Sequence, residues 1–168
     1  WRYVGDGDSA ADTFTIKDFG ATDYYNLVIL STDAADVYQL SAGLVVAGTL
    51  TVSAGTMNAN GNTNTVTGLA TIGGGVYQAS TATQTFNAGL TVSGGTFTGS
   101  TGAVDVNGNV ILSSGTLTAP SGTFTVSGDW TNSGGTFTPG GNTVTLDGTG
   151  SQTLSAETWS ALTVNTRA

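Results

Sequence analysis

The chain contains no cysteine and no histidine. Without cysteine it can form neither a disulfide framework nor a thiolate metal site. Without histidine it also lacks the side chain that most often acts as a general acid or base at neutral pH. These two absences remove the commonest catalytic arrangements and weigh against an enzyme.

Charge is also scarce. Charged residues make up 8% of the chain, about a third of the share in an ordinary soluble domain. The basic residues are Arg2, Lys17 and Arg167, and the net charge is −8. Because no basic patch can neutralise phosphates, we expect no nucleic-acid partner. No apolar run approaches the roughly 18 residues of a membrane-spanning helix, so we expect no transmembrane segment.

The residues that are abundant suit sheets and turns. The chain holds 26 glycines and 32 threonines, together with many valine, phenylalanine and tyrosine residues. Thr, Val, Phe and Tyr fit a pleated surface, whereas Gly, Asn and Ser fit turns. Strong helix formers such as Glu, Lys and Met are nearly absent. The composition therefore predicts an all-β fold.

A repeat of twenty residues organises the middle of the chain. LTVSGGTFTGSTGAVDVNGN, residues 90–109, aligns without a gap on VILSSGTLTAPSGTFTVSGD, residues 110–129. Three short segments recur at the same places in each repeat. They cover residues 90–92, 110–112 and 130–132, then 96–98, 116–118 and 136–138, and finally 103–106, 123–126 and 143–146. A fixed period of this length is typical of repeat folds.

Each segment alternates apolar and polar residues as a strand does, and glycine-rich corners separate the segments. Three strands and three corners close one turn, or rung, so equivalent strands stack in parallel, about 4.8 Å apart. The sequence predicts a parallel β-solenoid, a three-sided β-helix with about 20 residues per rung. By analogy with parallel crossover connections we expect a right-handed coil. An antiparallel sandwich or barrel is the alternative, because short strands at this spacing fit it too.

Two parts of the chain depart from the repeat. Residues 1–26 do not fit the twenty-residue line, and we expect an N-terminal cap or docking segment there. Residues 27–168 are then solenoid rungs with a strand-like C-terminal end. Asn132 takes an inward position where Val92 and Leu112 predict an aliphatic residue. Either an asparagine ladder begins at Asn132 or the register slips there.

Acidic side chains give one candidate metal site. Asp6, Asp8 and Asp12 lie in the stretch GDGDSAADTF and offer oxygen ligands of the kind that calcium accepts. The spacing is not that of an EF-hand, and a solvated acidic loop is the alternative. We expect no other cofactor.

The carboxylates in the middle of the chain are spread out. Asp105 falls at an outward strand position, and Asp129 and Asp147 fall at different corners. A general acid and base must lie within several ångströms of each other. We expect the corner carboxylates to bind turn amides, and we expect no catalytic site.

Outward threonines form the second candidate site. They are Thr96, Thr98, Thr116, Thr118, Thr136 and Thr138, and we call them the threonine grid. Stacked strands place such side chains about 6.7 Å apart along a strand and 4.8 Å apart between strands. The grid resembles the ice-binding face of β-helical antifreeze proteins, which implies an ice- or glycan-binding surface. Threonine also suits any exposed strand, which is the structural alternative.

Two tryptophans are candidates for sugar-stacking platforms. Trp130 stands in a column of Leu and Val, so we expect it in the core instead. Trp159 lies beyond the last clear rung, and we expect it to seal the open end.

Several motifs resemble a known class of proteins. LTVSGGTFT, GTFTVSGDW and GSQTLSAETWSALTVN are similar to the tandem units of large bacterial extracellular β-solenoids. That class includes filamentous-haemagglutinin-like adhesins and autotransporter passengers. The resemblance covers about residues 27–166 and implies an extracellular or cell-surface location, with adhesion or filament formation as the role. The chain starts at Trp1 rather than Met, and we expect a processed product or an excised fragment.

These observations predict a structural subunit of a bacterial surface fibre or adhesin. The terminal rungs of a solenoid carry unpaired backbone groups, so we expect end-to-end assembly with other copies or with neighbouring repeats. A surface glycan or a host receptor is a further candidate partner. An ice- or glycan-binding module is the alternative function, and a polysaccharide-active β-helix enzyme is the second alternative.

Overall fold

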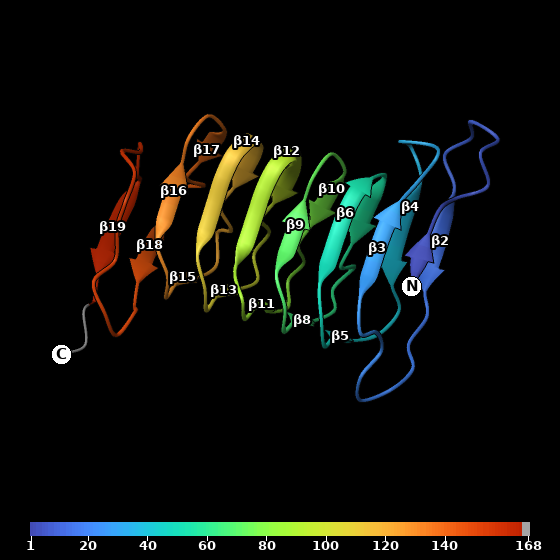
Figure 1. Cartoon of the computed structure of the whole chain (residues 1–168), viewed down its shortest axis with the longest axis horizontal. Coiled ribbons are helices and arrows are strands. Elements are labelled where there is room, and N and C mark those ends of the chain that lie inside the picture. Colours follow the sequence, from blue (N-terminus) through green and yellow to red (C-terminus); the bar gives the residue numbers. More distant parts are fainter. Residues whose placement is uncertain (166–168) are drawn as a thin grey trace.

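The structure is a computed structural model and describes residues 1–165. These residues form strands β1 to β19 and no helix, so no helix among them could span a membrane. The strands wind into a parallel β-solenoid of about eight turns. Figure 1 shows the rungs as a row along the long axis, with β2 near one end and β19 at the other. The predicted all-β solenoid is confirmed.

The strands stack in three columns, as the repeat predicts. The first column contains β1 (Arg2–Tyr3), β3 (Leu27–Leu30), β6 (Leu50–Ala54), β9 (Ala70–Ile72), the first parts of β12 (Leu90–Thr98) and β14 (Val110–Thr118), and β16 (Trp130–Asn132). The second contains β2 (Thr13–Ile16), β4 (Val37–Leu40), β7 (Thr56–Asn58), β10 (Val76–Gln78), the later parts of β12 and β14, and β17 (Thr136–Thr138). The third contains β5 (Leu44–Val46), β8 (Asn64–Val66), β11 (Gln84–Phe86), β13 (Val104–Val106), β15 (Phe124–Val126), β18 (Thr143–Leu146) and β19 (Ala161–Val164).

Neighbouring strands in each column are parallel. Through the middle of the chain, paired residues are twenty positions apart, as for Leu90 with Val110 and Val104 with Phe124. This pairing excludes the antiparallel sandwich or barrel. The first two columns form one sheet because β12 and β14 each run through both.

Alternate residues of each strand point into the solenoid and stack on their counterparts in the next rung. The buried set is mostly Leu, Val, Ile and Phe. The Tyr77 and Phe97 rings, for example, stack with centroids 5.2 Å apart and planes 5° apart. Each rung therefore hides its apolar side only against its neighbours, which makes the stack the unit of stability.

Residues 1–26 wind one more rung in the same three columns. The paired residues are Arg2 with Val28, Thr13 with Val37, and Tyr24 with Val46. The spacings are thus 26, 24 and 22 residues, which explains why this segment does not match the twenty-residue line. The segment lies at one end of the stack as a terminal rung rather than as a separate element.

The other end of the stack carries aromatic side chains. Trp130 is fully buried, as predicted, and its ring lies 4.8 Å from that of Phe137 and 5.0 Å from that of Trp159. Trp159 packs against this core from a loop that follows a bridge between Leu154 and Trp130. The chain then adds β19 to β18. Of the predicted rung region, residues 166–168 lie outside the described residues.

Asn132 keeps its register, pairing with Leu112, and no asparagine ladder forms. Its Nδ2 donates to Glu157 Oε1 at 2.6 Å and to the Gly135 carbonyl at 3.1 Å. Its Oδ1 accepts from the backbone N–H groups of Gly134 and Gly135. The inward amide is thus satisfied by the corner that follows it together with Glu157, so neither predicted explanation is needed.

Candidate functional site

The threonine grid forms as the repeat predicts. Thr96, Thr116 and Thr136 pair across β12, β14 and β17, and so do Thr98, Thr118 and Thr138. Some of the six side chains are exposed and the others half-buried. Within residues 1–165 none of these hydroxyls has a hydrogen-bonding partner on the protein, so all six are available to water or a ligand.

The outward face of the third column is a second polar surface, which sequence reasoning did not single out as a site. Hydroxyl groups on this face donate to carboxylates of the neighbouring rung. Thr125 Oγ1 donates to Asp105 Oδ1 at 2.7 Å, and Ser127 Oγ donates to Asp147 Oδ1 at 2.8 Å. These polar groups therefore already bind one another, whereas the hydroxyls of the threonine grid do not.

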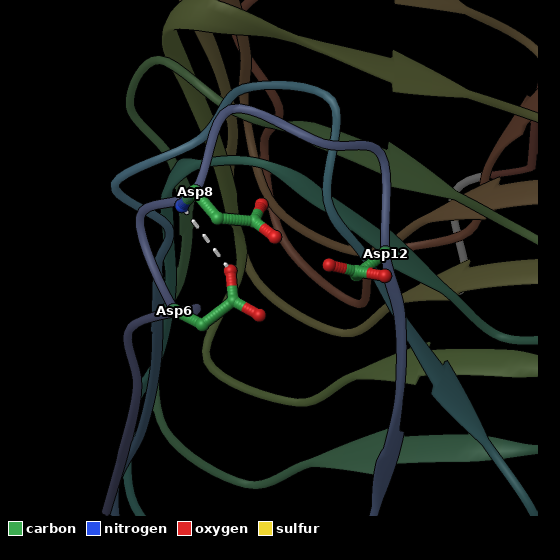
Figure 2. Close-up of side chains that lie close together, drawn as sticks. All are labelled: Asp6, Asp8 and Asp12. Atoms are coloured by element: carbon green, nitrogen blue, oxygen red, sulfur yellow. Dashed lines mark hydrogen bonds between the residues drawn. The ribbon is translucent and has the colours of Figure 1, made fainter.

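The acidic cluster of Asp6, Asp8 and Asp12 lies in the loop between β1 and β2. One carboxylate oxygen from each residue lies within 4.8 Å of the others, and Figure 2 shows the three side chains around one space. The Asp8 backbone N–H points to Asp6 Oδ1 at 3.5 Å. Partial desolvation, together with repulsion from Asp6, Asp8 and Asp36, raises the pKa of Asp12. Exposed carboxylates also gather without a metal, so calcium binding stays a prediction.

Asp36 is a buried carboxylate beside this cluster, and it was not among the predicted site residues. Ser31 Oγ donates to Asp36 Oδ2 at 2.6 Å, and the Asp12 backbone N–H donates to Asp36 Oδ1 at 3.3 Å. These bonds tie the acidic loop to the second rung. The sequence gives no sign that Asp36 is buried, because residues 31–36 form a corner, where the inward and outward alternation of a strand does not apply.

The carboxylates in the middle of the chain each bind a different structural partner. Asp129 Oδ1 accepts the Thr153 backbone N–H at 2.7 Å, which confirms the expected binding of a corner amide. Asp105 and Asp147 accept from hydroxyls of neighbouring rungs, as described above. The expectation of a turn amide was therefore wrong for the corner residue Asp147, which binds the Ser127 hydroxyl. Within the described residues, only the acidic cluster brings three such ligand groups close together.

A shallow polar hollow lies at the corner between the third and first columns. It has a volume of about 220 Å³ and is lined by Asn109, Ser127, Gly128, Asp129, Thr149, Gly150, Ser151 and Gln152. The Gln152 amide donates to the carbonyls of Val126 and Gly128, and it accepts from the Gly148 backbone N–H. The hollow is thus a corner held by its own hydrogen bonds.

Inside the solenoid, three polar side chains form what we call the polar triad: Asn64, Tyr77 and Gln84. Asn64 Nδ2 donates to the Tyr77 hydroxyl at 2.7 Å, and that hydroxyl donates to Gln84 Oε1 at 2.5 Å. All three side chains are fully buried, and burial raises the pKa of the Tyr77 hydroxyl. The strand alternation already places Asn64 and Gln84 inward, so the signal was present in the sequence.

Comparisons with known proteins gave no match. No protein-family model, no curated protein and no solved structure matches the chain.

Proposed function

We propose that the chain is a structural module of an extracellular surface fibre or adhesin, and that its terminal rungs stack on further solenoid rungs. The module acts through its length and its ends rather than through a catalytic site. One observation carries the proposal: the apolar side chains of the last described strand point inward, where no other part of residues 1–165 covers them fully.

The geometry of β19 defines this uncovered surface. Leu162 and Val164 pair with Val144 and Leu146, which point into the core and are buried. Leu162 and Val164 are nevertheless 36% and 54% exposed. Within residues 1–165, no strand lies on the far edge of β19. Such an edge has both apolar area and free backbone groups to pair, and a further rung satisfies both.

The sides of the stack support the same role. They carry hydroxyl and amide groups with little charge, and the resemblance of the repeats to bacterial surface solenoids implies an extracellular location. Antibody labelling of intact cells of the source organism tests this location. We expect surface labelling, and labelling only after permeabilisation would contradict it.

The assembly is tested with two lysine variants that add the same charge at different places. Leu162→Lys changes the end of the stack, and Ile111→Lys changes its side at a residue of nearly equal exposure, 37% against 36%. Light scattering and electron microscopy should show wild-type rods with lengths in steps of about 40 Å, which is eight rungs at about 4.8 Å. We expect Leu162→Lys to raise the concentration needed for assembly at least tenfold.

Ile111→Lys should assemble as the wild type does. Wild-type particles of a single chain at millimolar concentration would overturn the proposal, and so would equal effects of the two substitutions.

The threonine grid supports ice or glycan binding as a second candidate function. Its six hydroxyls are in register over three rungs and have no protein partner among the described residues. The test is thermal hysteresis and retention on insoluble polysaccharides, with Thr116→Tyr at the centre of the grid. Thr65→Tyr in the third column serves as the control. A wild-type chain with neither activity would remove this candidate.

A further inference from the structure

The polar triad lies where two rungs meet. Asn64 belongs to the rung of β6 to β8, whereas Tyr77 and Gln84 belong to the next rung, β9 to β11. Asn64 and Gln84 are paired neighbours in the third column. The Gln84 amide also donates to the carbonyl of Asn62 in the preceding rung, at 3.0 Å, and to Ser80 Oγ at 3.2 Å. The hydrogen bonds therefore join these two rungs specifically.

Other inward positions do not distinguish one rung from the next. Val92 and Leu112 take the same place in successive rungs, and so do Phe97 and Leu117. The backbone hydrogen bonds between parallel strands are also the same from rung to rung. A chain that leaves out one rung as a twenty-residue loop keeps the pairing among its other rungs, and the entropy cost of such a loop grows slowly with length. It does expose the buried side chains of the omitted rung, such as Ile72 and Phe86. Apolar stacking thus favours a complete stack, but its repeated side chains do not mark which rung follows which.

The polar triad removes this ambiguity. If the β6 to β8 rung stacked on the rung of β12 and β13, Asn64 would meet Val104 and Phe97, which offer no hydrogen bond. Gln84 and Tyr77 would lose their partner as well. A buried amide without a partner is strongly unfavourable. The correct order satisfies the Asn64 amide nitrogen and the whole Gln84 amide and leaves only Asn64 Oδ1 of these two amides without a partner.

We propose that the polar triad is a register lock, which makes the β9 to β11 rung, and no later rung, stack on the C-terminal side of the β6 to β8 rung. Buried polar groups serve this purpose in other repetitive folds, where they select one register at some cost in stability. The role does not depend on the proposed fibre function, because it concerns the folding of a single chain.

Engineered cysteines report the register directly, since the chain has no cysteine of its own. Thr51 and Thr71 are paired neighbours in the first column, whereas Thr91 lies one rung further on. A Thr51→Cys, Thr71→Cys chain reports the correct order. A Thr51→Cys, Thr91→Cys chain reports an omitted rung, because Cα atoms about 9.6 Å apart are beyond the reach of a disulfide. Each chain is refolded from urea at low concentration, oxidised briefly, and scored for monomeric disulfides.

The lock is removed by three substitutions to apolar residues: Asn64→Val, Tyr77→Phe and Gln84→Val. In this unlocked background we expect the yield of the Thr51–Thr91 disulfide to rise at least about tenfold, which is the factor that one unsatisfied amide supplies. A control with three apolar exchanges elsewhere should leave it at the wild-type level. The control carries Phe97→Leu, Val104→Ile and Phe124→Leu.

A second variant moves the lock by one rung. It carries Asn64→Val, Tyr77→Phe, Gln84→Asn, Phe97→Tyr and Val104→Gln. Ser100 occupies the place that corresponds to Ser80, so the new glutamine has an equivalent partner. Because stacking across an omitted rung would break the moved lock, the Thr51–Thr91 disulfide should return to the wild-type level.

Two results would overturn the proposal. One is an unlocked chain that has the wild-type circular dichroism spectrum and no Thr51–Thr91 disulfide. The other is an unlocked chain that does not fold, since the triad would then serve stability rather than register.

Discussion

The rungs in the middle of the chain and the N-terminal rung share three columns but are built differently. From Leu50 to Asp129 the paired strand residues keep a spacing of twenty, except at the corner pair Ser93 with Ser114. The stacked side chains there are mostly aliphatic or phenylalanine. In residues 1–26 the spacing ranges from 22 to 26, and the inward side chains are mainly aromatic. Columns therefore depend on inward side chains and backbone pairing, not on the length of the corners.

The two regions also satisfy their inward polar atoms differently. In the N-terminal rung the hydroxyls of Tyr3 and Tyr24 lie 2.9 Å apart, and the Tyr24 hydroxyl donates to the Lys17 carbonyl at 2.7 Å. In the middle rungs, polar side chains inside the core are confined to the polar triad and its neighbour Ser80. The terminal rung thus combines apolar packing with hydrogen bonds, whereas the middle relies on stacked apolar ladders.

The largest expected difference between the two regions concerns their phenylalanines. Phe97 is fully buried and packs against Tyr77 and Phe86 of the preceding rung. Phe14 is half-buried and stacks on Tyr38 with ring centroids 5.3 Å apart. Phe97→Ala should lower the free energy of unfolding by about 3–5 kcal/mol. Phe14→Ala should cost about 1–2 kcal/mol, because less area leaves water on folding. Urea unfolding followed by circular dichroism measures both.

Phe97→Leu is the matched control and should cost less than about 1.5 kcal/mol. Equal losses from the two alanine substitutions would mean that the terminal rung is packed as tightly as the middle.

A smaller effect is expected at the corners of the middle rungs. Gly115 and Gly61 have nearly equal backbone angles, φ +78° and +79°. A Cβ at Gly115 would overlap the carbonyl oxygen of Gly95 in the preceding rung, whereas a Cβ at Gly61 would meet nothing within 4 Å. Gly61→Ala should therefore cost about 1 kcal/mol for the left-handed backbone alone, and Gly115→Ala about 2–3 kcal/mol.

Thermal melting of the two glycine variants compares them under the same conditions. A Gly115→Ala chain as stable as Gly61→Ala would show that the stacked corner can shift to admit a methyl group.

The sequence predicted the middle of the fold well because period, alternation and corner residues all repeat there. Val104, Phe124 and Val144, for instance, mark one ladder at a spacing of twenty. Residues 1–26 were predicted to be a cap or docking segment because their corners differ in length. An alignment with a fixed period therefore does not detect that their strands belong to the same columns. The sequence predicted that the members of each candidate site lie together. For the acidic cluster the prediction came from closeness in the sequence, and for the threonine grid it came from the register of the repeat. The buried Asp36 required the structure, since its partners come from a corner and from a residue 24 positions away.

The smallest expected effect belongs to the acidic cluster of the N-terminal rung. The pKa of Asp12 is raised above its ordinary value of 3.8, so the folded chain holds this proton more tightly than the unfolded chain does. That contribution to stability is present below pH 3.8 and is lost as the pH rises through the raised pKa. Asp12→Asn removes the repulsion and should raise the melting temperature near pH 7, by on the order of 1 °C. The gain should vanish at pH 3.

Calcium sharpens this last comparison, because a bound cation reverses the effect of the charge. If the acidic cluster binds calcium as predicted, added calcium stabilises the wild type and not Asp12→Asn, since ligand binding to the folded state raises its stability. The ranking of the two chains at pH 7 then inverts with calcium. Equal melting temperatures of the wild type with and without calcium would contradict the predicted site and leave only charge repulsion in the cluster. The middle rungs have no such cluster among the described residues, so we expect calcium not to bind there.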